Sequence, residues 1–272
     1  MLEKFRKAQE PAVTRLAGLA AKGGMPAPYA GARPVFSEQL LLGAPGAVIA
    51  EYKRASPSLG AINLEAGPEE VAAMYATSGA SALSVLTEEA YFKGSIDFLF
   101  RMADPGLALL RKDFLIHPLQ VMETASTPAS ALLLIARMLE DSLLAAMLGE
   151  TYQAGMEAVL EVFDDDDLKK ARQALEKVRV TRPVIQVNNR DLQKLSTSDE
   201  PSRVLIRHKR EGEIWISASG IHSRKQVEER AALGFDAVLV GGSLMGHGNP
   251  GQALAELTGK LPRPDQGKAG VA

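Results

Sequence analysis

The stretch AVIAEYKRASPSLG, from Ala47 to Gly60, decides the architecture of this 272-residue chain. Residues 47–52 form an apolar run broken only by Glu51, and a Ser-Pro-Ser-Leu-Gly turn follows soon after. A short apolar run of this kind is typical of a buried parallel strand. Side chains alternate across a strand, so Glu51 and Lys53 are expected to project from one side at its C-terminal end. Buried charges need partners, so this pair either closes the strand as a structural ion pair or has a function.

Apolar runs like the first recur along the chain, and the segments between them mostly carry helical patterns. The runs lie at 47–52, 82–86, 107–111, 131–135, 157–162, 184–187, 214–217 and 237–240. The helical segments lie at 68–78, 95–102, 119–125, 140–154, 165–178, 200–207, 223–233 and 250–257. Strands that alternate with helices indicate parallel pairing, and eight such units predict an α/β fold of the (β/α)8 (TIM) barrel class. An open doubly wound sheet is the alternative, but it usually has fewer strands and a glycine fingerprint that this chain lacks.

The sequence predicts a single domain over residues 1–272, in three parts. Residues 1–45 are an N-terminal helical extension, with a helix over 1–21 in which Pro11 marks a kink or a restart. This extension cannot bury a core of its own, so we expect it to act as a cap or lid. The barrel spans residues 46–260, and the polar residues 261–272 are expected to form a disordered tail.

The composition argues against several classes of protein. Hydrophobic residues make up 46% and charged residues 24% of the chain, and the net charge of -2 gives no basic excess for nucleic acid or a membrane surface. The chain has no cysteine, and its four histidines have no ligand-like spacing, so we expect neither a disulfide nor a metal site. The charged start, MLEKFRKAQE, is unlike a secretory signal and predicts a cytoplasmic protein.

The active site of a (β/α)8 barrel lies at the C-terminal ends of its strands. The predicted strands place there Glu51, Lys53, Lys112, Asp113, Glu161, Asn188, Asn189, Arg190, Ser219, Gly220, Gly241, Gly242 and Ser243. Two lysines and two glutamates at one end of a barrel are more than the fold requires. A lysine in a low-dielectric pocket can act as an acid or a base, and a neighbouring glutamate can exchange protons or orient a substrate. We therefore predict an acid–base site.

The last two strand ends indicate an anion site. The segments SASGI (217–221) and VGGSLM (240–245) place glycines and small hydroxyl side chains after the seventh and eighth strands. Barrels of this class commonly hold a phosphate there, through backbone N–H groups and the N-terminus of a short helix. The glycines alone are equally compatible with simple turns. Because Arg190 and Lys53 can face the same anion, we favour a phosphate.

Eight segments resemble, in chain order, the indole-3-glycerol-phosphate synthase family of the tryptophan pathway. They are AEYKRASPSLG, ALSVLTEEAYFKGS, LLRKDFLIHPLQV, ALLLIARML, EAVLEVFDDDDL, IQVNNRDL, SASGI and DAVLVGGSLM. The resemblance runs from residue 48 to residue 245 and extends to the N-terminal helix. The EYKRASPS-like and LRKDF-like segments together are specific to this family, because related phosphate-binding barrels share only the last two motifs.

The resemblance implies a carbon–carbon carboxy-lyase that cyclises, decarboxylates and dehydrates 1-(2-carboxyphenylamino)-1-deoxyribulose 5-phosphate to indole-3-glycerol phosphate. Lys112 matches the general acid that activates the ribulose carbonyl. Lys53 matches the group that meets the substrate carboxylate, and it is a candidate acid for the dehydration. Glu161 matches the proton acceptor or second acid–base partner, and Glu51 matches the carboxylate that holds Lys53.

The other matches to the family concern substrate binding. Asn188 and Ser219 match residues that position the substrate in the catalytic site. The phosphate pocket corresponds to Ser56, Arg190, Gly220, Gly241 and Gly242, and the flanks of the aromatic ring to Phe92, Phe114 and Leu133. No metal or organic cofactor is implied. The implied partner is a small phosphosugar–anthranilate substrate, with no nucleic acid and no membrane, and the chain is expected to be a monomer or weak homo-oligomer.

The chain departs from the family pattern at two positions. Ala218 stands in Ser-Ala-Ser-Gly where the family commonly has glutamate, and Gly242 stands where many members have serine or glutamate. We expect activity to be retained, because the other acid–base residues are present. Two alternatives remain open. Another phosphosugar barrel, such as a phosphoribosylanthranilate isomerase, would need a cysteine or aspartate pair at the first strand, and a catalytically silent barrel that binds a phosphate ligand or a partner enzyme is supported only by Ala218.

Overall fold

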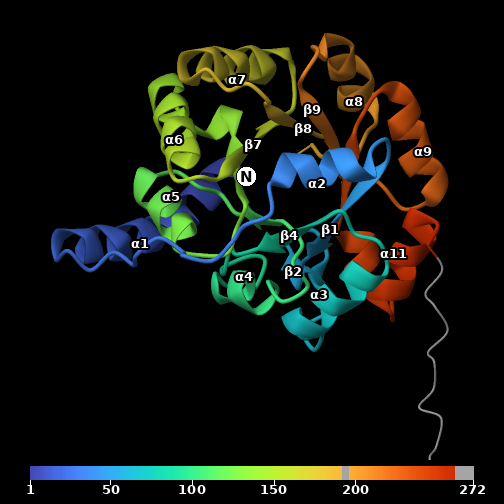
Figure 1. Cartoon of the computed structure of the whole chain (residues 1–272), viewed down its shortest axis with the longest axis horizontal. Helices are drawn as coiled ribbons and strands as arrows, with labels where there is room; N and C mark the ends of the chain where they lie inside the picture. Colours follow the sequence, from blue (N-terminus) through green and yellow to red (C-terminus); the bar gives the residue numbers. More distant parts are fainter. Residues whose placement is uncertain (192–195, 261–272) are drawn as a thin grey trace, which may run out of the picture.

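The computed structural model describes residues 1–191 and 196–260, and its centre is a closed barrel of eight parallel strands (Figure 1). The strands are β1 (Ala47–Tyr52), β4 (Ala82–Leu86), β5 (Leu109–Lys112), β6 (Ala131–Ile135), β7 (Glu157–Val162), β8 (Val184–Asn188), β9 (Ile214–Ala218) and β10 (Ala237–Val240). They pair in chain order, and β1 closes the barrel by pairing with both β4 and β10. The predicted (β/α)8 barrel with an N-terminal helix is confirmed, whereas the predicted tail, 261–272, lies outside the described residues.

Helices follow the strands around the outside of the barrel (Figure 1). They are α3 (Pro68–Thr77), α4 (Asp97–Arg101), α5 (Pro118–Ala125), η1 (Ala136–Met138), α6 (Asp141–Gln153), α7 (Asp165–Val178), α8 (Glu200–Leu205), η2 (Ile206–His208), α9 (Arg224–Leu233), α10 (Gly242–Met245) and α11 (Pro250–Thr258). The bounds of α7 are those predicted, because Asp164 caps the helix by accepting a hydrogen bond from the backbone N–H of Asp167 at 3.0 Å. Acidic residues in its first turn add a favourable interaction with the helix dipole.

The third strand of the barrel, β5, begins and ends later in the sequence than predicted. The apolar run predicted a strand over 107–111, but the structure has Leu109–Lys112. Gly106 has a φ of +72°, which makes a turn before the strand and delays its start. Because the strand ends one residue later than predicted, Lys112 belongs to the barrel itself and pairs in register with Leu86 of β4.

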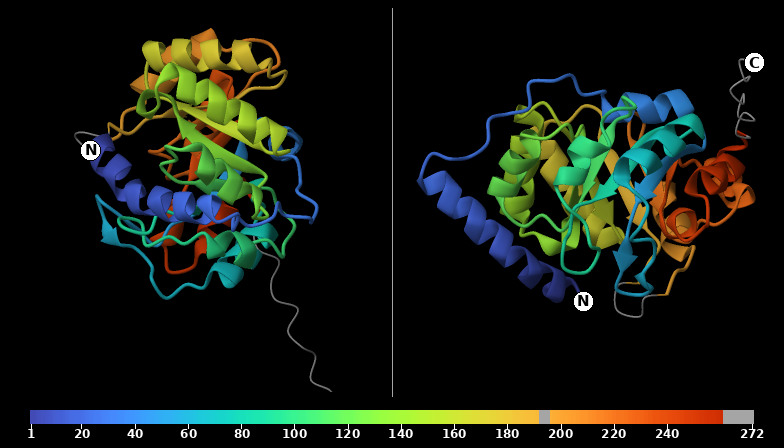
Figure 2. Two further views of the ribbon diagram at one scale, coloured as in Figure 1. Left: turned by 90° about the vertical axis from the view of Figure 1, so that its left-hand side faces the viewer. Right: turned by 90° about the horizontal axis from the view of Figure 1, so that it is seen from below.

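Two helices of the N-terminal extension lie at the barrel, one reaching each end. The helix α2 (Phe36–Gly43) lies at the end where the strands begin, since the backbone N–H of Ser37 donates to Glu157 Oε2 at 2.8 Å and Phe36 is fully buried. The longer helix α1 (Leu2–Ala21) continues through Pro11 without interruption. Figure 2 shows the N-terminus of α1 at the opposite end of the molecule from α2. The extension therefore supplies a plug at one end and reaches the mouth, the rim formed by the C-terminal strand ends, at the other.

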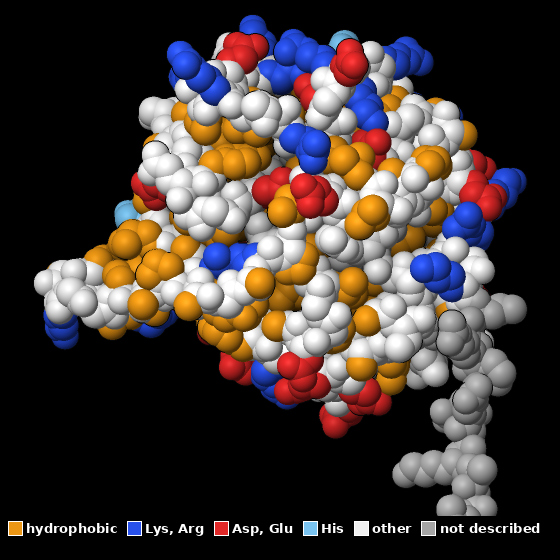
Figure 3. Space-filling model, in the orientation of Figure 1, with side chains coloured by type: hydrophobic (Ala, Val, Ile, Leu, Met, Phe, Trp, Pro, Cys, Tyr) orange, Lys and Arg blue, Asp and Glu red, His pale blue; other side chains and the backbone are white. Residues whose placement is uncertain are grey.

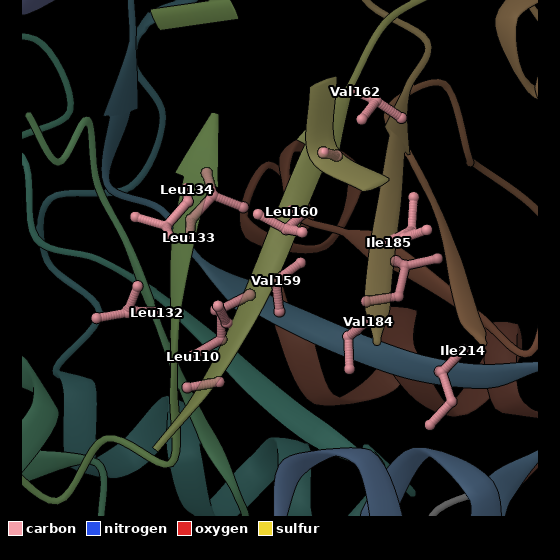
Figure 4. Close-up of a cluster of buried hydrophobic side chains, with 14 of the residues drawn as sticks. Leu110, Leu132, Leu133, Leu134, Val159, Leu160, Val162, Val184, Ile185 and Ile214 are labelled. Carbon is pink, nitrogen blue, oxygen red and sulfur yellow. The ribbon is translucent and has the colours of Figure 1, made fainter. Parts of the chain in front are cut away.

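Branched aliphatic side chains pack on both sides of the barrel strands, inside the barrel and beneath the surrounding helices (Figure 4). Inside the barrel, residues such as Leu133, Val159 and Ile216 are almost completely removed from solvent. Each buried side chain of this kind contributes about 1.5 to 3 kcal/mol relative to its exposed state. The barrel is thus a packed core rather than a pore, and a ligand must bind at its rim.

The outer surface is of mixed character. Figure 3 shows lysine, arginine, aspartate and glutamate side chains interspersed over one face, with hydrophobic side chains gathered where α1 lies. Among the helices in residues 1–191 and 196–260, none has the length and hydropathy needed to span a lipid bilayer.

Candidate active site

A cavity of about 550 Å³ opens at the mouth of the barrel, within the size range of small-molecule sites. Almost all of the site residues predicted from the sequence line it: Glu51, Lys53, Ser56, Phe92, Lys112, Phe114, Glu161, Asn188, Arg190, Ser219, Gly220, Gly241 and Gly242. Leu133 does not line this cavity and lies in the buried cluster instead. The lining also includes Met1 and Phe5 of the N-terminal helix.

Glu51 and Lys53 form an ion pair at the end of β1. The Lys53 ammonium donates to Glu51 Oε1 at 2.8 Å, and the hydroxyl of Ser84 donates to Oε2 at 3.4 Å. Burial alone would raise the pKa of the Glu51 carboxyl, but the ammonium groups of Lys53 and Lys112 and the two hydrogen bonds outweigh it and hold that pKa below its usual value. Glu51 is therefore a carboxylate at neutral pH, and it holds Lys53 at the cavity.

The backbone that follows β10 approaches this pair closely. A Cβ atom added to Gly241 would lie 2.2 Å from Glu51 Oε1, which no real side chain tolerates. A Cβ atom on Gly242 would meet only the Lys53 ammonium and the Leu59 side chain, at ordinary contact distances. Glycine at position 241 is thus required by the space that the Glu51 carboxylate occupies.

A second pair, Lys112 and Glu161, spans from β5 to β7. The Lys112 ammonium lies 3.9 Å from Glu161 Oε2, and the side chains are 18% and 3% exposed, respectively. The same carboxylate oxygen accepts a hydrogen bond from the side-chain amide of Gln186 on β8. The gap between the Lys112 ammonium and the Glu161 carboxylate is longer than a hydrogen bond, so the ammonium keeps N–H donors for a substrate atom in the cavity.

Asn188 organises the loops after β8 and β9. Its side-chain oxygen accepts hydrogen bonds from the Ser219 hydroxyl at 2.9 Å and from the backbone N–H of Arg190 at 3.0 Å. Ser219 and Gly220 both have left-handed backbone conformations, with φ of +71° and +80°. Residues other than glycine are uncommon in the left-handed region, and backbone strain of this kind is often found at functional sites. The loop is therefore held in a fixed, turned shape at the mouth.

An aromatic cluster forms another side of the cavity. Phe5 of α1 stacks on Phe114, with ring centroids 4.0 Å apart and planes inclined by 13°. Phe92 lies 6.1 Å from Phe5 and 5.9 Å from Phe114. The sequence predicted Phe92 and Phe114 at the site but not Phe5, because the periodicity of α1 identifies a buried face and not what that face contacts.

Buried polar side chains attach α1 to the strand that carries Lys112. The Gln9 amide donates to Asp113 Oδ1 at 2.9 Å, and it accepts from Gln120 at 2.8 Å. Arg111 pairs with Asp113 at 3.2 Å and with Glu123 at 3.1 Å. Arg111 and Asp113 flank Lys112, so this network fixes the backbone on both sides of the lysine. The sequence analysis did not find this role for Gln9.

Within the described residues, no group of three or more histidine, aspartate or glutamate side chains is arranged to hold a metal ion. The prediction that the protein needs no metal or organic cofactor stays a prediction. The chemistry that the described side chains can perform is proton transfer and ion pairing, carried by two ammonium groups and two carboxylates at one cavity.

A parallel (β/α)8 barrel with charged side chains and glycine turns at its C-terminal mouth is the architecture of the (β/α)8 barrel enzymes. Residues 31–257 match the family model described as indole-3-glycerol phosphate synthase. The chain is 40% identical to a protein of that name from Carboxydothermus hydrogenoformans over 77% of this chain and 78% of that one. A synthase of the same name from Aquifex aeolicus is also 40% identical, over 78% and 81%. This chain belongs to the indole-3-glycerol phosphate synthase family.

Solved structures with low sequence identity support the fold alone. A 3-hexulose-6-phosphate synthase from Salmonella typhimurium superposes with a TM-score of 0.60 at 15% identity, over 79% of this chain and 98% of that one.

Proposed function

We propose that this chain cyclises and decarboxylates 1-(2-carboxyphenylamino)-1-deoxyribulose 5-phosphate to indole-3-glycerol phosphate. This is the carboxy-lyase step of tryptophan biosynthesis that gives the family its name. The observation that carries the proposal is the convergence of the Lys53–Glu51 and Lys112–Glu161 pairs on one cavity at the C-terminal mouth. Ring closure, loss of carboxylate and loss of water each require a proton or a charge at a defined place, and these four groups can supply them.

Lys112 is the proposed general acid for ring closure. Attack of the aryl carbon on the ribulose carbonyl puts negative charge on the carbonyl oxygen, and an ammonium within hydrogen-bond reach neutralises that charge by donating a proton. The Lys112 side chain is 18% exposed and lines the cavity. Within the described residues, its nearest charged partner is Glu161 at 3.9 Å, which is beyond hydrogen-bond distance. Glu161 is proposed to take up a proton in a later step, and its position in the lining of the same cavity supports this role.

Lys53 is the proposed partner of the substrate carboxylate. Its ammonium is held by Glu51 at 2.8 Å and still lines the cavity, so it can meet a second carboxylate there. As carbon dioxide leaves, the same ammonium becomes available as an acid for the dehydration. Asn188 and Ser219, joined by a hydrogen bond of 2.9 Å, are proposed to position the substrate between the two pairs.

The two ends of the substrate are proposed to bind on different sides of the cavity. The aryl ring would lie against Phe92 and Phe114, with Leu133 supporting this side from the core below. The phosphate would be held by the polar and glycine residues of the strand-end loops, Ser56, Arg190, Gly220, Gly241 and Gly242. Anchoring both ends holds the chain folded for ring closure, which lowers the entropic part of the barrier.

The proposal includes the organisation of the chain as one domain, with the extension over residues 1–45 and the barrel over residues 46–260. It includes a monomer or weak homo-oligomer in the cytoplasm that acts on a small molecule rather than on nucleic acid. The net charge of -2, without a basic excess, supports the last point.

Turnover of the anilino-deoxyribulose phosphate, followed by the fluorescence of the indole product, tests the proposal. The wild-type chain should turn the substrate over, and Lys112→Ala should lose nearly all turnover because the proton donor for ring closure is gone. The control is Lys225→Ala on α9, whose side chain is 85% exposed, and it should match the wild type. A wild-type protein that forms no indole at any pH would contradict the function, and an active Lys112→Ala would contradict the role of Lys112.

A further inference from the structure

Gln186 is a buried amide directly beneath the proposed site. It lies on β8, two residues before Asn188, is fully buried, and does not line the cavity. Its side-chain Nε2 donates to Glu161 Oε2, the oxygen that also faces the Lys112 ammonium. Its side-chain Oε1 has no hydrogen-bond partner within the described part of the chain.

An amide is an unfavourable choice for this position on packing grounds. Its register partners are Ile216 on β9 and Glu161 on β7, and Val184 precedes it by two residues on the same side of β8. Apart from Glu161, these neighbours are aliphatic. A buried carbonyl oxygen without a partner costs stability, whereas an apolar side chain of the same size would not incur that cost. The compensating interaction is the hydrogen bond to Glu161, which is charge-assisted and therefore stronger than a hydrogen bond between neutral groups.

We propose that Gln186 is a positioning residue for Glu161. Its N–H group fixes the rotation of the carboxylate by holding Oε2 between Gln186 and Lys112. Because an amide N–H can only donate, a proton taken up by Glu161 is directed to Oε1, the other oxygen. Glu161 itself lines the cavity, so this arrangement presents Oε1 to the substrate. The inference rests on the proposed acid–base role of Glu161.

The variant Gln186→Met tests this role, because methionine has nearly the same length and volume but cannot donate a hydrogen bond. We expect kcat to fall about tenfold or more, the loss typical of one hydrogen bond to a charged group, while KM changes less than about twofold. Ile216→Met, at the paired position on β9, is the matched control and should stay within about twofold of the wild-type kcat. A Gln186→Met variant with the wild-type kcat would overturn the inference.

A double-variant comparison separates positioning from a general structural effect. If Gln186 acts through the carboxylate, Gln186→Met should cost less than about twofold in kcat when it is added to Glu161→Gln, because nothing remains to be positioned. Losses that multiply in the double variant would overturn the inference. If Gln186→Met does not fold, Gln186→Leu is measured in the same two backgrounds, since it also removes the N–H donor, and it is judged by the same criteria.

The same experiments distinguish the inference from the proposal beneath it. A Glu161→Gln variant with the wild-type kcat would remove the acid–base role of Glu161, and the inference with it. If Glu161→Gln is impaired and Gln186→Met is not, the role of Glu161 stands and only the inference about Gln186 fails.

Discussion

Replacing Gly241 by alanine tests whether Glu51 and Lys53 act as a pair. The added Cβ would lie 2.2 Å from Glu51 Oε1 and 2.9 Å from both Cβ and Cδ of the same side chain. Glu51 is 4% exposed and its backbone belongs to β1, so the strain falls on the carboxylate, which must move by about 1 Å. Oε1 is the oxygen that accepts the 2.8 Å hydrogen bond from Lys53, so the movement separates the pair.

The size of the effect follows from three contributions. Overpacking costs about 1 to 3 kcal/mol, and weakening a charged hydrogen bond costs about 1.5 to 3 kcal/mol. The smaller entropy of the unfolded alanine chain offsets about 0.4 to 1 kcal/mol of this. We therefore expect a net loss of about 3 kcal/mol, which lowers the melting temperature by about 6 to 12 °C. Because a misplacement of about 1 Å in a catalytic group can cost about a hundredfold in rate, kcat/KM should fall by at least that factor.

Thermal unfolding followed by circular dichroism gives the stability, and indole fluorescence gives kcat/KM. The neighbouring variant Gly242→Ala is the control for stability, because its Cβ would meet nothing closer than 3.8 Å and should change stability by less than about 0.5 kcal/mol. The reasoning is refuted if Gly241→Ala melts at the same temperature as Gly242→Ala and keeps the wild-type kcat/KM.

Three further predictions concern the same cavity. Phe5→Ala removes the ring stacked on Phe114 and should raise KM about fivefold or more, and an unchanged KM would mean that α1 does not support the aryl site. Ala218→Glu restores the carboxylate common in the family and should leave kcat intact or raise it, whereas a tenfold loss would contradict our view of this position. Because the folded-state pKa of Glu51 lies below its usual value, its contribution to stability is present above the unfolded pKa of about 4.3 and is lost as the pH falls through the folded pKa. Urea midpoints measured between pH 6 and pH 3 should therefore fall more steeply for the wild type than for Glu51→Gln. Equal slopes would contradict a stabilising contribution from the Glu51 carboxylate.

The strands and most of the mouth could be predicted from the sequence because both follow from local rules. Apolar runs of strand length identify the barrel, and alternation along a strand determines that Glu51 and Lys53 share a side. The C-terminal ends of parallel strands then meet at one rim whatever the details of the helices. Lys112, Glu161 and Asn188 come together in the structure for this reason, although they lie far apart in the chain.

The parts of the site that the sequence did not predict depend on side-chain contacts between distant elements. Phe5 reaches the cavity only because α1 docks against α5 and the segment after β5, and Gln9 helps to fix that docking through Asp113. Helical periodicity identifies the buried face of α1 but cannot identify the surface that covers it. Gln186 interrupts an aliphatic strand, which is a visible irregularity, but its meaning depends on a carboxylate from the neighbouring strand. A polar residue in an otherwise apolar barrel strand is therefore the sequence signal that would have identified Gln186. Burying a polar side chain without any hydrogen-bond partner costs too much stability to be left uncompensated.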